Sequence, residues 1–412
     1  MDLIVRNARL DGRDGTVDIG VDGETIAAIR DHIEESAPNE IDAEGDLTTT
    51  SFVNPHMHVD KCLKASTMRQ NESQTLQEAI LITWEFKRNY ETEDIVSRAG
   101  QVVEAALRNG TTAMRMFADV DTIGGLAPVE GELETKNRYG HLMDLEVVAF
   151  PQEGILRDQG TEDLMRKAME MGADVAGGLP WYERTDEEAR RHVDIVFDIA
   201  KEFDTDIHML VDDTDDPTSR SLEYLAVKTM DEGYHGRVTA SHCGALAAYD
   251  DTYAAKVISM VDDAGISICS NPHISLVLSG RRDKEPIRRG MTRVKELLAA
   301  GVNVCSGQDD VHDPYYPFGR ADQLEVALIA AHATHLTYPT ELRTVFDMVT
   351  ANAARAMRLD WHGLEEGKRA DIVVFQAKTL VDALRLQAPR RFVIRKGRLA
   401  ARSRLESELV AG

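Results

Sequence analysis

Eight short apolar runs alternate with stretches of helical period through the middle of this 412-residue chain, and this alternation restricts the possible folds more than any other feature. Amphipathic stretches such as 189–203 and 254–264 separate most of the runs. Strands that alternate with helices form parallel sheets, and eight such units close into a barrel. We therefore expect an α/β protein built on a distorted (β/α)8 TIM barrel. The runs span residues 47–53, 111–117, 145–150, 173–178, 205–211, 237–241, 266–269 and 302–305.

Both ends of the chain carry shorter alternating runs, which are typical of strands separated by turns. Residues 3–5, 17–21 and 25–29 form such runs near the N-terminus, and 370–375 and 391–394 form them near the C-terminus. Because β-rich ends flank one long middle, we expect the two ends to build a single small β-sandwich domain. The expected division assigns residues 1–50 plus 360–412 to the sandwich and residues 51–359 to the barrel.

The side-chain charges exclude two classes of partner. Acidic residues number 71 and basic residues 47, which gives a net charge of −24. A surface of this sign repels phosphate backbones and anionic membranes, so we expect neither a nucleic-acid nor a membrane partner.

The four cysteines are widely spaced, which is typical of reduced thiols, and the first residues show no secretory signal. We therefore expect a cytoplasmic protein.

Polar side chains gather where the first and last runs of the barrel end. His56 and His58 follow the first run with Met57 between them, so strand alternation places both imidazoles on one side. Two such imidazoles can bind one transition-metal ion. Asp309 and Asp310 follow the last run, and closure of a barrel brings the first and last strands together. These four residues predict a metal centre in which one carboxylate is a ligand and the other accepts protons.

Two more runs end in residues that suit the same chemistry. His242 follows the sixth run and could bind the metal or orient a water molecule. Gln152 follows the third run. Its side-chain amide offers a donor and an acceptor together, which suits the lactam-like edge of a heterocycle.

Longer stretches of the chain, in order and over nearly its whole length, resemble the cytosine deaminase family of the amidohydrolase superfamily, including N-isopropylammelide amidohydrolase-like enzymes. The resemblance implies a barrel with a small β-sandwich, one divalent metal ion (zinc or iron), a small heterocyclic substrate and a homo-oligomer. It implies an aminohydrolase that cleaves carbon–nitrogen bonds other than peptide bonds, in which activated water attacks a ring carbon of a cyclic amidine and ammonia leaves. The matching stretches are FVNPHMHVDK at 52–61, AFPQEGIL at 149–156, GADVAGGLP at 172–180, RVTASHCGALAAY at 237–249, GRRDKEPIRRGMTRVKELL at 280–298, NVCSGQDDVHDPYYPFG at 303–319 and GLEEGKRADIVVF at 363–375.

The resemblance also implies roles for single residues. Lys61 follows the histidine pair as it does in relatives that act on ring amines, and its ammonium could contact a substrate carbonyl or carboxylate, or pair with a neighbouring acid such as Asp60. By position, the other implied roles are metal ligands at His56, His58 and Asp309, proton transfer at Asp310, a histidine beside the attacking water at His242, recognition of the ring edge at Gln152, and a pocket wall at Tyr315.

The fifth run departs from the family. A gapless match places Leu210 where the family has a histidine ligand, and Asp213 where it has a catalytic glutamate. A leucine cannot coordinate a metal ion. Aspartate is one methylene shorter than glutamate, so a proton transfer through Asp213 would need a closer substrate or a bridging water.

Three arrangements of the metal site are then open. His208 could replace the missing ligand, although it lies about 7 Å back along the strand, nearer the barrel floor. His242 could bind the metal, which gives a ligand set of His56, His58, His242 and Asp309. The site could also hold metal weakly or not at all. We expect the second arrangement, because metal enzymes commonly use three protein ligands and an open water position.

These readings lead to one main hypothesis and two alternatives. The main hypothesis is metal-dependent hydrolytic deamination of a small nitrogen heterocycle, cytosine-like or a related cyclic amidine. One alternative is hydrolysis of a cyclic amide or of an N-alkylamino ring substituent without ammonia release. The other, motivated by Leu210, is a metal-free, non-catalytic binding protein. Under the main hypothesis the catalytic residues are Asp213, His242 and Asp310, and the substrate-binding residues are Gln152, Lys61 and Tyr315.

Overall fold

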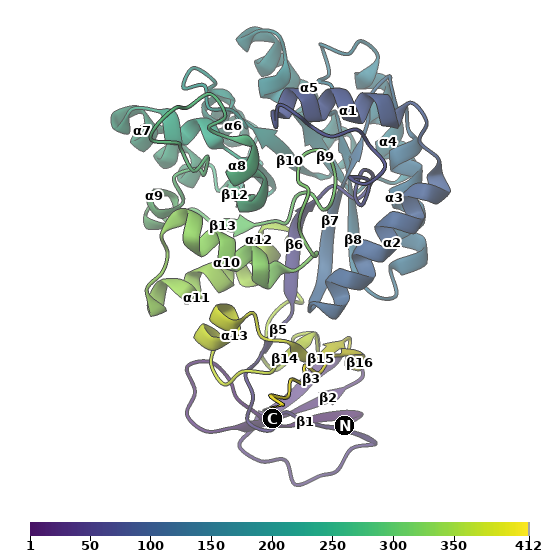
Figure 1. Cartoon of the computed structure of the whole chain (residues 1–412), viewed down its shortest axis with the longest axis vertical. Helices are drawn as coiled ribbons and strands as arrows, with labels where there is room; N and C mark the ends of the chain where they lie inside the picture. Colours follow the sequence, from purple (N-terminus) through teal and green to yellow (C-terminus); the bar gives the residue numbers. More distant parts are fainter. Residues whose placement is uncertain (411–412) are drawn as a thin grey trace.

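The structure is a computed structural model that describes residues 1–410, and it contains an eight-stranded parallel barrel above two small sheets in the view of Figure 1. The barrel strands pair in sequence order, and a bridge between Met57 and Asp309 joins the two ends of the sheet, so the barrel is nearly closed. The predicted (β/α)8 barrel is confirmed. Its strands are β6 (Phe52–Met57), β7 (Thr111–Asp119), β8 (Asp144–Phe150), β9 (Val175–Gly178), β10 (Asp206–Val211), β11 (Val238–His242), β12 (Ser267–Ser270) and β13 (Val304–Ser306).

Helices lie outside the barrel strands, as Figure 1 shows. The helix that follows β9 illustrates why they form: Val193, Phe197 and Ala200 recur at helical spacing on its buried face, and the Thr185 side chain caps its first turn. The helices are α1 (Leu76–Lys87), α2 (Thr92–Arg108), α3 (Ala127–Tyr139), α4 (Thr161–Met171), α5 (Asp186–Phe203), α6 (Ser221–Asp231), α7 (Asp251–Asp263), α8 (Pro272–Leu278), α9 (Val294–Ala299), α10 (Gln323–Thr334), α11 (Pro339–Met348), α12 (Ala351–Ala356) and α13 (Leu380–Leu386), with short 3-10 helices η1 (Pro180–Tyr182) and η2 (Gly244–Ala248).

Both ends of the chain form small sheets, which confirms the predicted sandwich. Apolar side chains from the two sheets, such as Val5 and Ile19 from one and Ile372 and Ile394 from the other, pack into one core. The division at residues 50 and 360 stays a prediction, and residues 411–412 of that range lie outside the described part. The first sheet has the order β3 (Thr25–Arg30), β2 (Val17–Asp22), β1 (Leu3–Ala8) and β4 (Asn39–Asp42), and the second has the order β16 (Arg398–Arg402), β15 (Arg390–Arg395), β14 (Ile372–Phe375) and β5 (Thr48–Thr50).

The run at 47–53 differs from the expectation of a single barrel strand. Thr48–Thr50 pairs with β14 in the C-terminal sheet, and the barrel strand begins only at Phe52, where the chain pairs with β7. The apolar pattern alone could not separate two consecutive strands that belong to different sheets. Because β6 continues to Met57, His56 lies within the barrel strand and His58 follows it directly.

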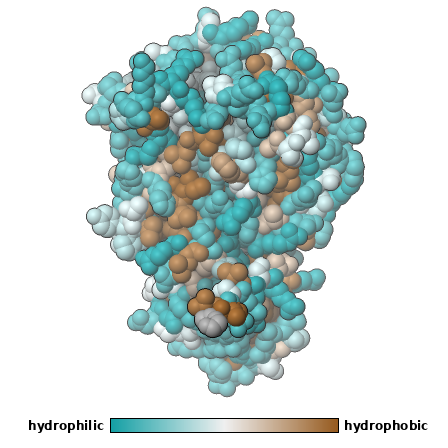
Figure 2. Space-filling view, viewed as in Figure 1, coloured by the Kyte–Doolittle hydropathy of each residue, from teal (hydrophilic) through white to brown (hydrophobic). Residues whose placement is uncertain are grey.

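Figure 2 shows a face covered mostly by hydrophilic side chains, with apolar ones in smaller groups. In residues 1–410, no helix has the length and apolar character needed to cross a membrane. All four cysteines are buried and free within the described chain.

Candidate metal centre and active site

Two strand ends far apart in the sequence are joined at the closing point of the barrel. The His58 backbone N–H donates to the Asp309 carbonyl over 2.8 Å, and the Asp309 N–H donates to the His56 carbonyl over 3.0 Å. The Asp309 backbone has a φ of 70° and that of His242 has a φ of 67°. Left-handed backbone at residues other than glycine costs about 1 kcal/mol or more, so the surrounding contacts must hold these two residues in place.

Three imidazoles converge on the carboxylate of Asp309. His56 Nε2 lies 3.2 Å from Asp309 Oδ1, and His58 Nε2 lies 3.5 Å from the same oxygen. The two imidazole nitrogens are 3.3 Å apart, and His242 Nε2 lies 3.5 Å from Asp309 Oδ2. That oxygen is buried without a hydrogen-bond partner among the described residues. Three imidazole nitrogens around one carboxylate fit the donor set of a divalent transition-metal ion.

The electrostatics of this cluster favour the forms that coordinate a metal. Burial lowers the pKa of His56, and burial together with the Lys61 ammonium lowers that of His58 well below its ordinary value. Both imidazoles are therefore neutral near pH 7. Burial alone would raise the pKa of Asp309, but the neighbouring His56 and His242 outweigh it and hold this pKa below its ordinary value. The carboxylate is therefore ionised.

The fifth strand places Leu210 and His208 at different depths. Leu210 lines the cavity beside the cluster and is 7% exposed. His208 Nε2 instead lies 2.6 Å from the Ser241 hydroxyl, which is also 2.7 Å from His56 Nδ1. His208 thus approaches the Nδ1 side of His56, whereas the Nε2 side faces Asp309. One group of potential ligand atoms within 4.8 Å of one another consists of His56, His242 and Asp309. A second such group consists of His56, His208 and Cys269.

A narrow cavity opens at the carboxyl ends of the barrel strands, where barrel enzymes carry their active sites. Of the predicted residues, His58, Lys61, Gln152, Asp213, His242, Asp309, Asp310 and Tyr315 all line it, and apolar walls come from Leu76, Ile80, Leu179, Trp181, Leu210, Ile274 and Leu278. A larger cleft lies between the barrel and the terminal sheets, and its lining includes Thr50, Arg355 and His362 but none of the predicted site residues.

Two carboxyl groups in the cavity have raised pKa values. Burial raises the pKa of Asp213, whose Oδ1 lies 3.6 Å from His242 Nδ1. Burial also raises the pKa of Asp310 well above its ordinary value, and the neighbouring Asp313 and Asp309 raise it further. Asp310 Oδ1 has no hydrogen-bond partner within residues 1–410. Carboxyl groups with raised pKa values can exchange protons with a substrate near neutral pH.

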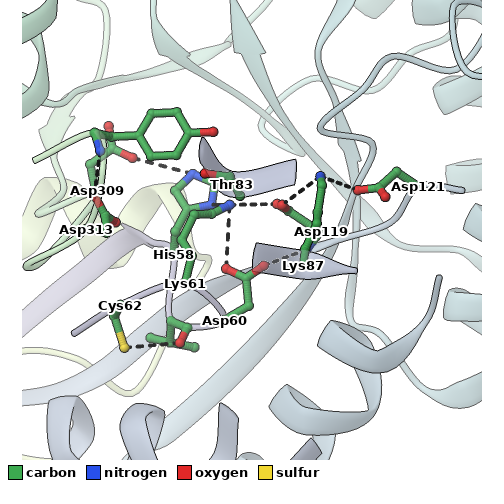
Figure 3. A network of polar contacts seen from close by, with 12 residues as sticks. His58, Asp60, Lys61, Cys62, Thr83, Lys87, Asp119, Asp121, Asp309 and Asp313 are labelled. Carbon is green, nitrogen blue, oxygen red and sulfur yellow. Dashed lines mark hydrogen bonds and ion pairs between the residues drawn. The ribbon is translucent and has the colours of Figure 1, made fainter. Parts of the chain in front are cut away.

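Lys61 reaches the cavity and also forms a buried ion pair, as Figure 3 shows. Its Nζ lies 2.7 Å from Asp119 Oδ1, 3.3 Å from His58 Nδ1 and 3.5 Å from Asp60 Oδ1. A third group of potential metal ligands consists of His58, Asp60 and Asp119. The Lys61 ammonium already lies among these three side chains. The predicted neighbour Asp60 is present, but the closer partner is Asp119.

A second buried lysine extends this network. Lys87, at the end of α1, lies 3.4 Å from Asp119 Oδ2, 2.6 Å from Asp121 Oδ2 and 2.8 Å from Glu153 Oε1 (Figure 3). Sequence reasoning missed all four residues. Asp119 ends the second barrel strand and Asp121 lies just beyond it, so the rule that polar residues at strand ends carry function could have found them. Lys87 gave no comparable signal, because a lysine in the last turn of an amphipathic helix is ordinary.

The whole chain is similar to known proteins. The model of the Amidohydrolase family matches residues 76–405. N-isopropylammelide isopropyl amidohydrolase of Pseudomonas sp. (strain ADP) is 32% identical over 403 residues, covering 97% of this chain and 96% of that protein. The crystal structure of 5-methylcytosine deaminase from Klebsiella pneumoniae liganded with 5-fluorocytosine is similar, with a TM-score of 0.95, 35% identity and coverage of 98% and 99% of the two chains. N-isopropylammelide isopropylaminohydrolase from Burkholderia multivorans gives a TM-score of 0.87 at 27% identity, over 98% and 99% of the chains.

Proposed function

We propose, from the premise that this chain belongs to the amidohydrolase family, that it is a metal-dependent deaminase of a small nitrogen heterocycle, cytosine-like or a related cyclic amidine. One observation carries the proposal. His58, His242 and Asp309 converge in the same cavity as Gln152 and Asp310, so a metal-ligand set and groups suited to a heterocycle share one small space.

His56, His58, His242 and Asp309 would hold one divalent ion, either zinc or iron. Such an ion supplies Lewis acidity and makes water a nucleophile near neutral pH. This assignment gives Leu210 no coordinating role and leaves its side chain as part of the apolar wall.

The other residues of the cavity would bind the substrate and move its protons. The Gln152 amide can donate to and accept from adjacent ring positions, and the Lys61 ammonium can donate to a ring carbonyl. Asp310, whose Oδ1 has no hydrogen-bond partner in the described part of the chain, and Asp213, beside His242 Nδ1, would transfer protons to the ring nitrogen and to the departing ammonia. The apolar walls exclude bulk water and strengthen these contacts.

A second candidate function is hydrolysis of an N-alkylamino substituent, with an amine as the product in place of ammonia. The similarity to N-isopropylammelide isopropyl amidohydrolase supports it. The four aliphatic side chains of Leu76, Ile80, Ile274 and Leu278 also line the cavity and would suit an alkyl group. The third possibility, a metal-free binding protein, is weakened by the convergence of the three imidazoles and Asp309.

The proposal is tested by metal analysis followed by product analysis. We expect about one zinc or iron ion per chain, and loss of the ion in Asp309→Asn and His242→Asn. The matched control is His362→Asn, because His362 is a buried histidine outside the cavity. The metal-loaded protein is then given cytosine, 5-fluorocytosine, isocytosine, creatinine, aminotriazines and N-isopropylammelide, and ammonia and isopropylamine are measured. Ammonia supports deamination and isopropylamine supports the second function. Bound metal without turnover of any compound would contradict both.

A further inference from the structure

One hydrogen-bond donor in the wall of the narrow cavity has no acceptor. Trp181 lines the cavity, and its indole Nε1 is buried without a hydrogen-bond partner among residues 1–410. An indole N–H only donates, and folded proteins rarely leave a buried donor unpaired because this costs free energy. The apolar side chains against which the indole packs, among them Leu179 and Leu210, offer no acceptor. The donor is therefore available to a molecule that enters the cavity.

The turn that carries the indole holds it in place. Residues Pro180–Tyr182 form the 3-10 helix η1 after β9, and the Tyr182 N–H donates to the Leu179 carbonyl over 3.3 Å. The Tyr182 ring packs edge-on against the indole with the ring centres 5.8 Å apart, and the Arg157 guanidinium covers the Tyr182 ring at 4.3 Å. A donor that is already oriented loses little conformational freedom when a ligand binds, so this packing favours recognition.

Trp181 lies on the same wall of the cavity as Gln152. The strands β8 and β9 are parallel neighbours, so the segments that follow them and carry these two residues begin side by side. Glu183 ties the two segments together, because its carboxylate accepts from three backbone N–H groups of residues 155–157. The amide of Gln152 and the indole of Trp181 therefore approach a bound ring from one side.

This wall lies across the barrel from the proposed metal centre. His58 and Asp309 lie at the closing point of the barrel, where β6 meets β13. In the order of the sheet, β9 is three strands from β6 and four strands from β13, which is about halfway around. A ring whose reacting carbon is turned toward the metal centre would present its remote side to Gln152 and Trp181.

We propose that Trp181 is a specificity residue whose indole N–H donates to a carbonyl oxygen on the side of the ring remote from the reacting carbon. This inference rests on the proposed function and narrows its substrate class. A carbonyl oxygen has two lone pairs, so it can accept from the indole and from a second donor of the cavity. The substrate class is accordingly an amino heterocycle with an oxo group, such as cytosine, in preference to a ring that carries amino groups alone.

Kinetics of a variant without the indole N–H test this role. Trp181→Phe keeps an aromatic ring in the wall, and the substrate is the oxo-substituted ring that the metal-loaded protein turns over best. We expect KM to rise roughly five- to fiftyfold, because a buried acceptor loses its donor, while kcat changes little. Trp361→Phe is the matched control, because Trp361 stacks on Arg369 outside the cavity. Its KM should equal that of wild type.

A second substitution separates the N–H from the packing of the ring. The residue 3-benzothienylalanine has the shape of tryptophan with sulfur in place of the N–H, and it is introduced in place of Trp181 by codon reassignment. It should raise KM as much as Trp181→Phe does. A wild-type KM in this variant would show that the indole only fills space, and it would refute the inference.

A matched pair of rings identifies the acceptor. Cytosine and 4-aminopyrimidine differ by the carbonyl oxygen and the ring hydrogen that accompanies it, and their affinities are compared through KM or through competitive inhibition of the best substrate. Wild type should bind cytosine roughly five- to fiftyfold more tightly, and Trp181→Phe should remove most of this difference. An equal loss of affinity for both rings would refute the carbonyl oxygen as the acceptor.

The outcomes separate this inference from the proposed function. A metal-loaded wild type that turns over no ring would refute the proposed function, and the inference with it. Turnover only of rings without a carbonyl would refute the inference alone. An unchanged KM in both variants of Trp181 would do the same.

Discussion

Asp309 and Asp310 are adjacent in sequence, yet their surroundings shift their pKa values in opposite directions. The imidazoles of His56 and His242 keep the pKa of Asp309 below its ordinary value, despite a burial that opposes this. Burial and the carboxyl groups of Asp313 and Asp309 raise the pKa of Asp310. One carboxylate is therefore suited to hold a cation, and its neighbour is suited to exchange a proton.

The role of Asp310 leads to a prediction about turnover without loss of metal. Asp310→Asn should retain the wild-type metal content, because Asp310 is not one of the proposed ligands. We expect kcat/KM to fall by about 10²- to 10⁴-fold, the usual contribution of one proton-transfer group. The exposed Asp263→Asn on α7 serves as control. Wild-type kcat/KM in Asp310→Asn would exclude Asp310 from the reaction.

At the scale of single residues, the sequence predicted most of the polar residues that line the cavity. It did not predict the residues that contact them from outside the cavity. Histidines and carboxylates at strand ends identified residues that line one cavity, among them Gln152 and Asp213. Ser241 was missed, because a serine inside a buried strand has no distinguishing pattern until its partners are known. His208 was considered as a ligand, and only its contact with Ser241 shows which side of His56 it approaches.

Helix α1 forms one wall of the cavity at its beginning and is held to the barrel at its end. Leu76 and Ile80 line the cavity, and Lys87 contacts carboxylates that follow β7 and β8. The apolar residues of this helix have only weak helical periodicity, so the sequence did not single the helix out. Its attachment could not be predicted either, because it depends on carboxylates that lie 32 to 66 residues further along the chain.

Removal of Lys87 should destabilise the protein strongly. Lys87→Met would leave the buried carboxylates of Asp119, Asp121 and Glu153 without their shared cation, which costs about 3–5 kcal/mol of unfolding free energy. Urea unfolding measures this cost, and hydrogen exchange should show faster exchange in α1. The control is Lys136→Met, whose pair with Asp174 is about one-third exposed and worth at most about 1 kcal/mol. Equal costs for the two variants would contradict this role of Lys87.

The loop after β8 depends on another buried carboxylate. Glu183, directly after η1, accepts from the backbone N–H groups of Ile155, Leu156 and Arg157 at 2.6, 3.0 and 2.8 Å, and from His192 Nδ1 at 2.7 Å. Burial would raise the pKa of Glu183, but these hydrogen bonds outweigh it and lower the pKa below its ordinary value of 4.5. The folded state therefore favours the ionised form.

The sign of that shift predicts how stability depends on pH. A lowered folded pKa contributes stability that is complete above pH 4.5 and is lost as the pH falls through the folded value. Glu183→Gln should cost about 1–3 kcal/mol at pH 7. The difference from wild type should shrink as the pH falls below 4.5, as measured by urea unfolding across this range. A difference that stays constant down to pH 3 would show that the carboxylate charge is not involved.

The barrel and the C-terminal sheet share the largest apolar core of the molecule. Phe375 and Val393 from that sheet belong to the same cluster as Phe52 and Leu107 from the barrel. The Phe52 ring packs edge-on against Phe375 with the ring centres 6.0 Å apart. In addition, β5 and β6 are consecutive in the chain and lie in different sheets. The two parts are therefore coupled in packing and in connectivity.

This coupling predicts a single unfolding transition for the whole molecule. Scanning calorimetry should show one peak with equal calorimetric and van't Hoff enthalpies. A chain ended at residue 359 should not fold, because β5 would lose β14 and the shared core would lose Phe375 and Val393. Two separate peaks, or a folded chain of residues 1–359, would show instead that the barrel is independent of the terminal sheets.

The backbone bonds between His58 and Asp309 have a consequence for the order of events during synthesis. The ribosome completes His56 and His58 some 250 residues before it reaches Asp309. Until then, the two histidines have neither the carboxylate nor the last strand beside them. A partly translated chain therefore cannot form the proposed metal centre, which is complete only when the last strand closes the barrel. Metal uptake in a translation reaction would thus report the moment at which the barrel closes.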